Sequence, residues 1–388
     1  MGTAKIDGLL QGAVSNGELP GVVAFAADSK GVIYQGAYGR RAIDSDAPMT
    51  CDTVFWIASM SKPITTVAAL QLVEKGKLKL DEPLGGLLPE LVTVKVLEEF
   101  DNDGVPHLRD SKRPVTLRHL LTHTSGFAYD FLNESLLRYY MNETIPPIGE
   151  CKNITLLKTP LLFDPGDRWE YGISLDWAGK AIEAASGQPF NDYLWDNILA
   201  PLGMNDTAFI IKPAMRSRLA AVHVRNADGS LVRIEFEMPQ EPEFCMGGSG
   251  LYSTAGDYRT FLQMILHGGT LNGVGILQPE TVQKMGRNQI GDLNVPPLKS
   301  AIPALANDLE FFPGMVKKWG LGFMLTTEDA PTGRSAWSMS WCGIANTYFW
   351  VDPVKQVIGG ALTQVLPGAD ARAEDLFARF ETSVYQQL

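Results

Sequence analysis

The sequence predicts an α/β (α+β) protein in which an antiparallel sheet is flanked by helices and a mostly helical domain is inserted in the middle. Two observations carry this prediction. A helix followed by a hairpin opens the chain, and a hairpin followed by a helix closes it, while the segment between them is mostly helical and rich in loops. We expect residues 1–85 and 315–388 to form one α/β domain and residues 86–314 to form the inserted domain, with the functional site in the cleft between them.

The opening elements follow from periodicity and turn chemistry. Residues 6–16 predict a helix that ends near Gly17, and the apolar runs 22–27 and 32–38 predict two strands. Asp28-Ser29-Lys30-Gly31 lies between those runs and is typical of a turn, so the two strands are expected to form an antiparallel hairpin.

The middle of the chain contains several helical patterns. These are found at residues 64–73, 116–121, 175–186, 190–199 and 254–267. Residues 296–313 contain several prolines and little periodicity, and we interpret them as a long surface loop and a candidate lid.

The end of the chain mirrors its beginning. Residues 346–351 and 356–363 predict two strands joined by the turn Asp352-Pro353-Val354-Lys355. Residues 369–386 predict a helix with an apolar face. Because both ends build the same domain, the two termini are expected to lie close in space.

Composition excludes several classes of protein. The 388-residue chain carries a net charge of -11 without a run of Lys or Arg, so nucleic acid is not an expected partner. Neither a secretory signal nor a stretch long enough to span a membrane is visible, and we expect a cytoplasmic protein. The four cysteines form no C-x-x-C pair and are expected to be free thiols.

The five histidines do not predict a metal site. His119 and His123 are four residues apart, but no Glu follows the first as in H-E-x-x-H. We expect these imidazoles to cap a helix or to form local hydrogen bonds, and we expect no metal and no cofactor.

One segment, Ser59-Met60-Ser61-Lys62, holds the only S-x-x-K spacing in the chain. Residues three apart are neighbours on a helix, so Lys62 is expected beside Ser59. A serine hydroxyl becomes a good nucleophile when a base within hydrogen-bond reach takes its proton, and lysine serves as that base when burial lowers its pKa. Ser59 is also expected to cap the following helix, because serine is favoured there.

Two later segments are candidates to complete such a site. Tyr171 follows the turn Asp164-Pro165-Gly166-Asp167 and precedes a predicted helix, so its phenol is expected to project into a cleft and relay a proton. Trp341-Cys342-Gly343-Ile344 comes just before a strand, and one of its backbone N–H groups, paired with that of Ser59, is a candidate oxyanion hole. Each segment taken alone also fits ordinary packing.

Together, the S-x-x-K segment, Tyr171 before a helix and the Trp/Gly strand near the C-terminus resemble the class C β-lactamase and family VIII carboxylesterase superfamily over nearly the whole chain. Leu120-Leu121-Thr122-His123-Thr124-Ser125-Gly126 is typical of these proteins. In finer detail, residues 116–126, 164–172 and 175–180 are similar to fungal acyltransferases and esterases that act on statin-type polyketide side chains. The resemblance implies a β-lactamase/penicillin-binding-protein-like fold.

The resemblance also implies roles for individual residues. It makes Ser59 the nucleophile, Lys62 the general base and Tyr171 the proton relay. Tyr129 matches a tyrosine that lines the acyl site in the statin-type relatives, and it also fits plain packing. No metal or cofactor is implied.

The chain departs from the β-lactamase pattern at two places. Ile173 stands where those enzymes have the Asn of Tyr-x-Asn, and residues 338–343 lack the Lys of Lys-Thr-Gly. Both changes remove polar contacts to a β-lactam and favour esters with apolar acyl parts. The register of this last strand stays open, so the oxyanion N–H is expected from Trp341, Gly343 or Ile344.

We therefore expect a serine carboxylesterase, a carboxylic ester hydrolase that acts on an ester with an apolar acyl group, such as a statin-type polyketide side chain, through an acyl-enzyme on Ser59. Acyl transfer to an alcohol acceptor is the alternative. Weaker alternatives are a β-lactamase and a catalytically silent binding protein of the penicillin-recognition type. The expected partner is a small-molecule ester, with no nucleic acid and no membrane.

Overall fold

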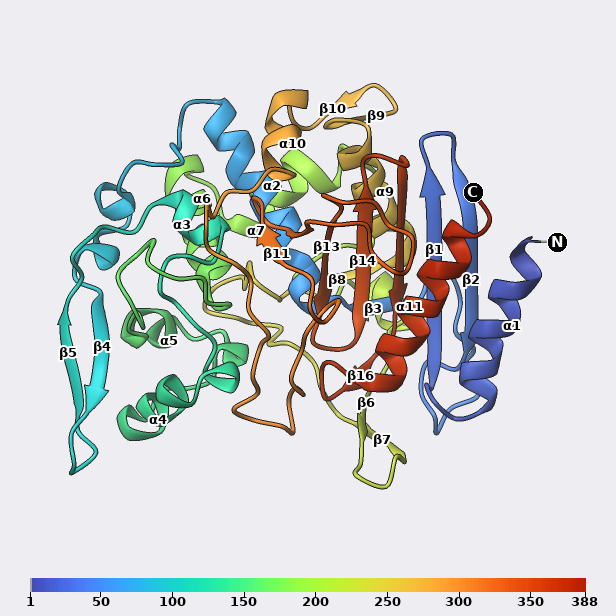
Figure 1. The fold of residues 1–388 in the computed structure, drawn as a ribbon, viewed down its shortest axis with the longest axis horizontal. Helices are drawn as coiled ribbons and strands as arrows, with labels where there is room; N and C mark the ends of the chain where they lie inside the picture. The colour runs from blue at the N-terminus through green and yellow to red at the C-terminus, as the bar shows by residue number, and fades with distance from the viewer. Residues whose placement is uncertain (1) are drawn as a thin grey trace.

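A seven-stranded antiparallel sheet forms the centre of the structure, a computed structural model that describes residues 2–388. Strands from the two ends of the chain lie side by side in it, because β15 pairs with β1 (Figure 1). The strands, in spatial order, are β11 (Lys317–Trp319), β12 (Met324–Thr326), β13 (Met339–Gly343), β14 (Thr347–Asp352), β15 (Val357–Leu362), β1 (Gly21–Asp28) and β2 (Val32–Gly39). The predicted sheet built from both termini is confirmed.

The two faces of the sheet face separate hydrophobic cores. Along β1, Val22 belongs to the smaller core and Val23 to the larger one, as the alternation of side chains in a strand requires. The smaller core is closed by α1 (Gly2–Ser15) and α11 (Ala371–Tyr385), which pack together on the same side of the sheet (Figure 1).

The two ends of the chain lie close together, as predicted. The ammonium group of Lys5 on α1 donates a 2.6 Å hydrogen bond to the side-chain oxygen of Gln386, which directly follows α11.

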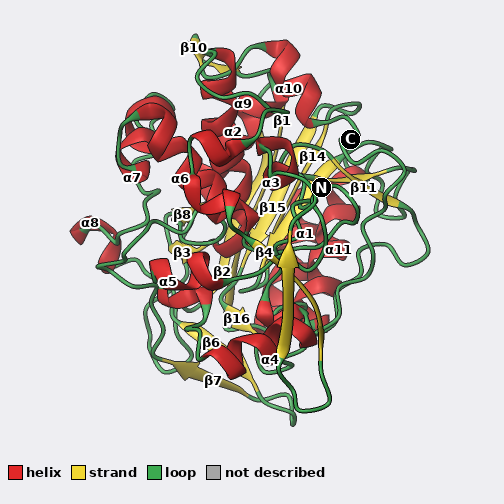
Figure 2. Ribbon diagram, turned by 90° about the vertical axis from the view of Figure 1, so that its left-hand side faces the viewer, coloured by secondary structure: helices red, strands yellow, loops and turns green. Residues whose placement is uncertain are grey.

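The opposite face of the sheet carries the helices that position the site. α9 (Ala255–Leu266) packs on β1 and β15, and α2 (Ser61–Glu74) packs on α6 (Ser174–Ser186). In Figure 2, α2 and α6 lie on one side of the sheet and α11 on the other. Residues 61–72 of α2 are all buried, so this helix is covered on every side.

The remaining elements surround this centre. The other helices are α3 (Leu117–Leu121), α4 (Glu134–Glu143), α5 (Asn153–Lys158), α7 (Phe190–Leu194), α8 (Pro213–Arg216) and α10 (Pro279–Met285). Short helical turns are η1 (Ala58–Met60), η2 (Leu84–Gly86), η3 (Pro89–Val92), η4 (Asp130–Leu132), η5 (Ile148–Glu150) and the π turn η6 (Trp195–Leu199).

Four small sheets lie outside the central one. They pair β3 (Val54–Trp56) with β8 (Tyr252–Thr254), β4 (Lys95–Phe100) with β5 (Pro106–Asp110), β9 (Thr270–Leu271) with β10 (Val274–Gly275), and β6 (Val222–Arg225) with β7 (Leu231–Ile234) and β16 (Val365–Leu366).

Most predicted elements are confirmed within a few residues, and the differences have local causes. The strands of the small sheets were not predicted, because segments of two to six residues show too little alternation. The helix predicted over 190–199 is helical throughout, but η6 forms its second half. Residues 296–313 contain no helix and no strand longer than an isolated bridge in the described chain. The division into two domains stays a prediction.

Two further expectations concern single groups. His119 completes a capping box with Thr116 at the start of α3, a local role of the kind predicted for the histidines. All four cysteines are free thiols. In the part of the chain that the structure describes, no helix has both the length and the apolar character needed to cross a membrane.

Candidate active site

Ser59 lies in η1, immediately before α2 and against β13. Ala58 precedes it with a φ of 44°, a left-handed conformation that is strained for a residue with a side chain, and Ala58 is fully buried. Strained backbone of this kind persists only where the surroundings impose it, and it clusters at functional sites. The strain at Ala58 therefore makes the neighbouring Ser59 a candidate functional residue.

The prediction that Ser59 caps the following helix is wrong. α2 begins at Ser61 and has no side-chain cap, because Ser59 is already inside a helical turn. The hydroxyl of Ser61 donates to the carbonyl of Ala58 at 2.7 Å and accepts from the N–H of Leu251 at 3.1 Å, which ties the turn to its neighbour. The hydroxyl of Ser59 is left free to contact Lys62.

Lys62 lies in the first turn of α2 and is fully buried. Its Nζ is 3.0 Å from Oγ of Ser59, 3.1 Å from the hydroxyl of Tyr129 and 2.9 Å from the carbonyl oxygen of Gly248. Burial lowers the pKa of Lys62, and the charge of Asp176 raises it. A lysine with a lowered pKa next to a serine hydroxyl can accept that proton.

Tyr171 reaches the same point from the loop that precedes α6. Its hydroxyl accepts a 2.8 Å hydrogen bond from Nε1 of Trp341, and Nζ of Lys62 is 4.5 Å from the centroid of its ring. Burial raises the pKa of Tyr171, and hydrogen bonds with Ser59 and Trp341 lower it. The structure thus brings Ser59, Lys62 and Tyr171 together, as the sequence predicts.

Aromatic packing explains why the phenol is held there. The ring of Tyr171 lies 4.8 Å from that of Trp341 and 4.7 Å from that of His123, measured between centroids. The next residue, Gly172, has no room for a side chain, because a Cβ would lie 2.4 Å from the carbonyl oxygen of Phe127. The loop can therefore pass close to its neighbour and deliver the tyrosine.

The strand after the aromatic cluster supplies backbone groups. A Cβ on Gly343 would lie 2.5 Å from the carbonyl oxygen of Ile57, so β13 approaches η1 as closely as it does because this residue is glycine. Ile344 follows β13, and within residues 2–388 its N–H donates to no protein acceptor. The side chain of Trp341 points to Tyr171, whereas Tyr129 contacts Lys62.

Asp176, Gly248 and His123 also belong to the site, and none of them was predicted from the sequence. The carboxylate of Asp176 accepts from the N–H of Gly248 at 2.9 Å, and Gly248 in turn contacts Lys62. Nδ1 of His123 accepts from the N–H of Gly172 at 3.4 Å, and burial lowers the pKa of this imidazole well below its usual value. An acidic residue on the apolar side of a predicted helix was the available signal for Asp176.

A narrow pocket opens beside Ser59. No charged side chain lines it. It is bordered by Ser59, Phe131, Leu132, Tyr171, Leu298, Ala306, Asn307, Leu309, Trp341, Cys342, Gly343, Ile344, Gly368 and Ala369. Part of this wall comes from the long loop 296–313. The pocket therefore suits an uncharged, apolar group.

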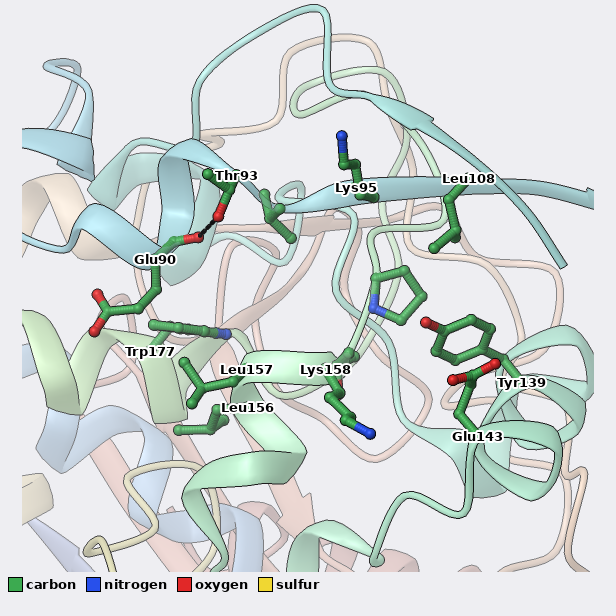
Figure 3. Close-up of a pocket in the computed structure, with 13 residues that line it drawn as sticks. Glu90, Thr93, Lys95, Leu108, Tyr139, Glu143, Leu156, Leu157, Lys158 and Trp177 are labelled. Atoms are coloured by element: carbon green, nitrogen blue, oxygen red, sulfur yellow. Dashed lines mark hydrogen bonds between the residues drawn. The ribbon is translucent and has the colours of Figure 1, made fainter.

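A second, separate hollow lies among β4, β5, α4 and α5 (Figure 3). Its lining includes Glu90, Lys95, Tyr139, Glu143 and Lys158 but none of the residues around Ser59. Nowhere in residues 2–388 do three or more His, Cys, Asp or Glu side chains gather so that they could hold a metal ion.

Comparison with known proteins identifies the family. The model of the β-lactamase family matches residues 6–383. The chain belongs to the β-lactamase family. It is 35% identical to monacolin J acid methylbutanoyltransferase of Aspergillus terreus over 97% of this chain and 94% of that protein. It is 32% identical to lovastatin esterase of Penicillium rubens over 98% of both chains.

Solved structures agree with this assignment. The β-lactamase-family fold found here matches simvastatin synthase of Aspergillus terreus with a TM-score of 0.87 at 33% identity, covering 99% of this chain and 98% of that one. A penicillin-binding protein homologue from Pyrococcus abyssi matches with a TM-score of 0.66 at 22% identity, covering 97% and 77%, and supports the fold alone. The predicted β-lactamase/penicillin-binding-protein-like fold is confirmed.

Proposed function

We propose that this β-lactamase-family protein is a serine carboxylesterase that hydrolyses an ester with an apolar acyl group through an acyl-enzyme on Ser59. The observation that carries the proposal is the buried amine of Lys62, 3.0 Å from Oγ of Ser59. An uncharged lysine in that position can remove the hydroxyl proton, and Tyr171 stands at the same serine.

The first half of the reaction forms the acyl-enzyme. Neutral Lys62 accepts the proton of Ser59, so the O–H bond breaks and an N–H bond forms at Nζ, while the electron pair of Oγ forms a bond to the ester carbonyl carbon. When the tetrahedral intermediate collapses, the bond to the alcohol breaks, and the leaving oxygen takes a proton from the hydroxyl of Tyr171. The proton held by Lys62 then replaces the one that Tyr171 gave up, so both side chains return to their starting forms. Water then repeats the sequence and releases the acid.

Two backbone N–H groups are proposed to stabilise the oxyanion, those of Ser59 and Ile344. Ser59 is at the start of a helical run, where N–H groups have no intrahelical acceptor. The N–H of Ile344 is unpaired in the described chain, and Ile344 lines the pocket beside Ser59. Of the three candidates in this segment, Ile344 is the donor that we propose.

The substrate class follows from what the pocket contains. Its lining is uncharged, Ile173 stands where β-lactamases have the Asn of Tyr-x-Asn, and residues 338–343 lack the Lys of Lys-Thr-Gly. Two of the relatives are a lovastatin esterase and a methylbutanoyltransferase that acts on monacolin J acid. We therefore propose an ester with a branched or polyketide-type acyl group, and we propose hydrolysis over β-lactam cleavage.

Acyl transfer to an alcohol is the second candidate, because the 35% identity to a methylbutanoyltransferase favours it specifically. The same three residues serve both outcomes, and only the acceptor differs. A panel of p-nitrophenyl esters of increasing acyl length and a bulky polyketide ester, each incubated with and without an alcohol acceptor, separates the two. Free acid in both arms supports hydrolysis, and a new ester supports transfer. Neither product, together with no fluorophosphonate adduct on Ser59 by intact mass, would refute both.

Trp341→Phe is expected to lower kcat about fivefold. The substitution keeps an aromatic ring but removes the 2.8 Å hydrogen bond to the hydroxyl of Tyr171, and one such bond is worth about 1 kcal/mol net. Steady-state kinetics on a p-nitrophenyl ester checks this result. Trp337→Phe is the matched control, because Trp337 is 45% exposed and is not part of the site. Equal kcat values for the two variants would contradict the role of the indole N–H.

Gly343→Ala is expected to lower kcat about 100-fold, the loss typical of one oxyanion donor. The added Cβ would lie 2.5 Å from the carbonyl oxygen of Ile57, so β13 must shift away from η1 and carry Ile344 with it. Gly256→Ala is the control, since the nearest atom to its Cβ is 3.8 Å away. Kinetics and thermal unfolding are measured on both, and an unchanged kcat in Gly343→Ala contradicts this geometry.

A further inference from the structure

Asp176 is a buried carboxylate that the proposed reaction does not use. It lies in the first turn of α6 and is fully buried. One of its oxygens accepts from the N–H of Gly248 at 2.9 Å, and the other has no hydrogen-bond partner within residues 2–388. A buried carboxylate that is only half satisfied is costly, so its presence calls for a compensating role.

Gly248 links this carboxylate to the proposed base. Its N–H is held by Asp176, and its carbonyl oxygen accepts from Nζ of Lys62 at 2.9 Å. A Cβ at this position would lie 2.9 Å from the unpartnered oxygen of Asp176 and 3.1 Å from the hydroxyl of Tyr129. Glycine therefore allows the carboxylate, this peptide and the phenol next to Lys62 to pack together.

Few other groups around Lys62 can balance its charge. The titratable groups that act on it or contact it come from four places: Asp176 on α6, Cys342 on β13, Tyr171 on the loop before α6, and His123 and Tyr129 on the loop after α3. Burial raises the pKa of the thiol and of both phenols and lowers that of the imidazole, so these groups are uncharged near neutral pH. Burial also raises the pKa of Asp176, to about 6, while the N–H of Gly248 and the charge of Lys62 lower it. Within the described chain, Asp176 is therefore the acidic group of this set that carries a negative charge near neutral pH.

We propose that Asp176 is a positioning residue that holds the peptide of Gly248 against Lys62 and supplies the negative charge that balances Lys62 when it takes the proton of Ser59. This inference rests on the proposed function. Asp176 touches neither substrate nor the reacting atoms, and it acts through the lysine. Its charge stabilises the ammonium form, which makes the amine a stronger base during acylation.

The pH dependence follows from the sign of this interaction. A carboxylate raises the pKa of a nearby lysine, so removing its charge lowers the pKa of Lys62. Neutral Lys62 is the active form, so the acid limb of kcat/KM moves to lower pH in the variant. We expect a shift of about one pH unit, the low end for an opposite charge at this range. The weaker base also lowers the plateau kcat, by roughly tenfold, while KM stays the same.

Asp176→Asn is the decisive variant, because the amide oxygen keeps the hydrogen bond from Gly248 while the charge is lost. Asp176→Ala removes both and gives the same charge test should the amide variant fail to fold. Asp257→Asn is the matched control. Asp257 is also a largely buried carboxylate whose pKa is raised by burial, but it accepts its hydrogen bonds from the backbone N–H of Asp206 and the hydroxyl of Thr207.

Profiles of kcat/KM against pH on a p-nitrophenyl ester are measured for all three variants and for the unmodified enzyme. An acid limb displaced to lower pH in both Asp176 variants, and unmoved in Asp257→Asn, supports the inference. An unmoved limb in a folded Asp176→Asn overturns it, even if kcat falls. Fluorophosphonate labelling of the unmodified enzyme tests the proposed function separately. That function predicts an adduct on Ser59 whether or not Asp176 has the proposed role, so a missing adduct would refute the function itself.

Discussion

Replacing Ser59 by alanine is expected to abolish ester turnover, with a loss on the order of 10⁴-fold or more in kcat, because the hydroxyl that takes up the acyl group is removed. Burial raises the pKa of Cys342 and of Tyr171, which also line the pocket, so neither is a ready substitute nucleophile. The fold should survive. Ser59 donates no capping bond to α2, and the lysine keeps its contacts with Tyr129 and Gly248. Steady-state kinetics, far-UV circular dichroism and intact mass after fluorophosphonate treatment check these expectations together.

A matched serine makes the result specific. Ser253→Ala also removes a buried hydroxyl, one that lies 2.7 Å from that of Thr207 and outside the site. We expect Ser253→Ala to keep both turnover and the adduct, and Ser59→Ala to lose both. Turnover in Ser59→Ala near that of the unmodified enzyme would place the nucleophile elsewhere and end the proposed mechanism.

The parts of the fold that the sequence predicts are those determined by local pattern. The hairpin of β1 and β2 consists of two apolar runs with a turn between them, and α11 has an apolar face with a capping aspartate, Asp370. The pairing of β1 with β15 was inferred only from the symmetry of the two chain ends. Short strands such as β3 and β8 carry no such signal, because they form through pairing with each other across almost 200 residues.

The candidate site also contains contacts that the sequence predicts and contacts that it does not. The S-x-x-K spacing is local, so Lys62 could be placed beside Ser59 from the sequence. The contact of Asp176 with Gly248, and of Trp341 with Tyr171, joins segments that lie far apart in the chain, and no spacing encodes it. The backbone at Ala58 explains the one mistaken role, since a left-handed residue places Ser59 inside a turn.

Replacing Lys62 by methionine is expected to lower kcat/KM by about 10³-fold or more, since it removes the base and its contact with the nucleophile in one step. Methionine has a similar length and packs easily in apolar surroundings, so the fully buried position should tolerate it. Lys62→Arg should be equally inactive, because a guanidinium stays protonated at any accessible pH and cannot accept a proton. Kinetics at several pH values and the rate of fluorophosphonate labelling are the measurements.

The double variant tests whether the two residues act as one unit. If Lys62 works only by activating Ser59, then Ser59→Ala combined with Lys62→Met should be no slower than Ser59→Ala alone, because the base has no nucleophile left to activate. Additive losses would mean that Lys62 contributes in a way that does not pass through the serine. A Lys62→Met variant that labels Ser59 at the rate of the unmodified enzyme would show that the hydroxyl needs no amine, and the 3.0 Å contact would then be structural.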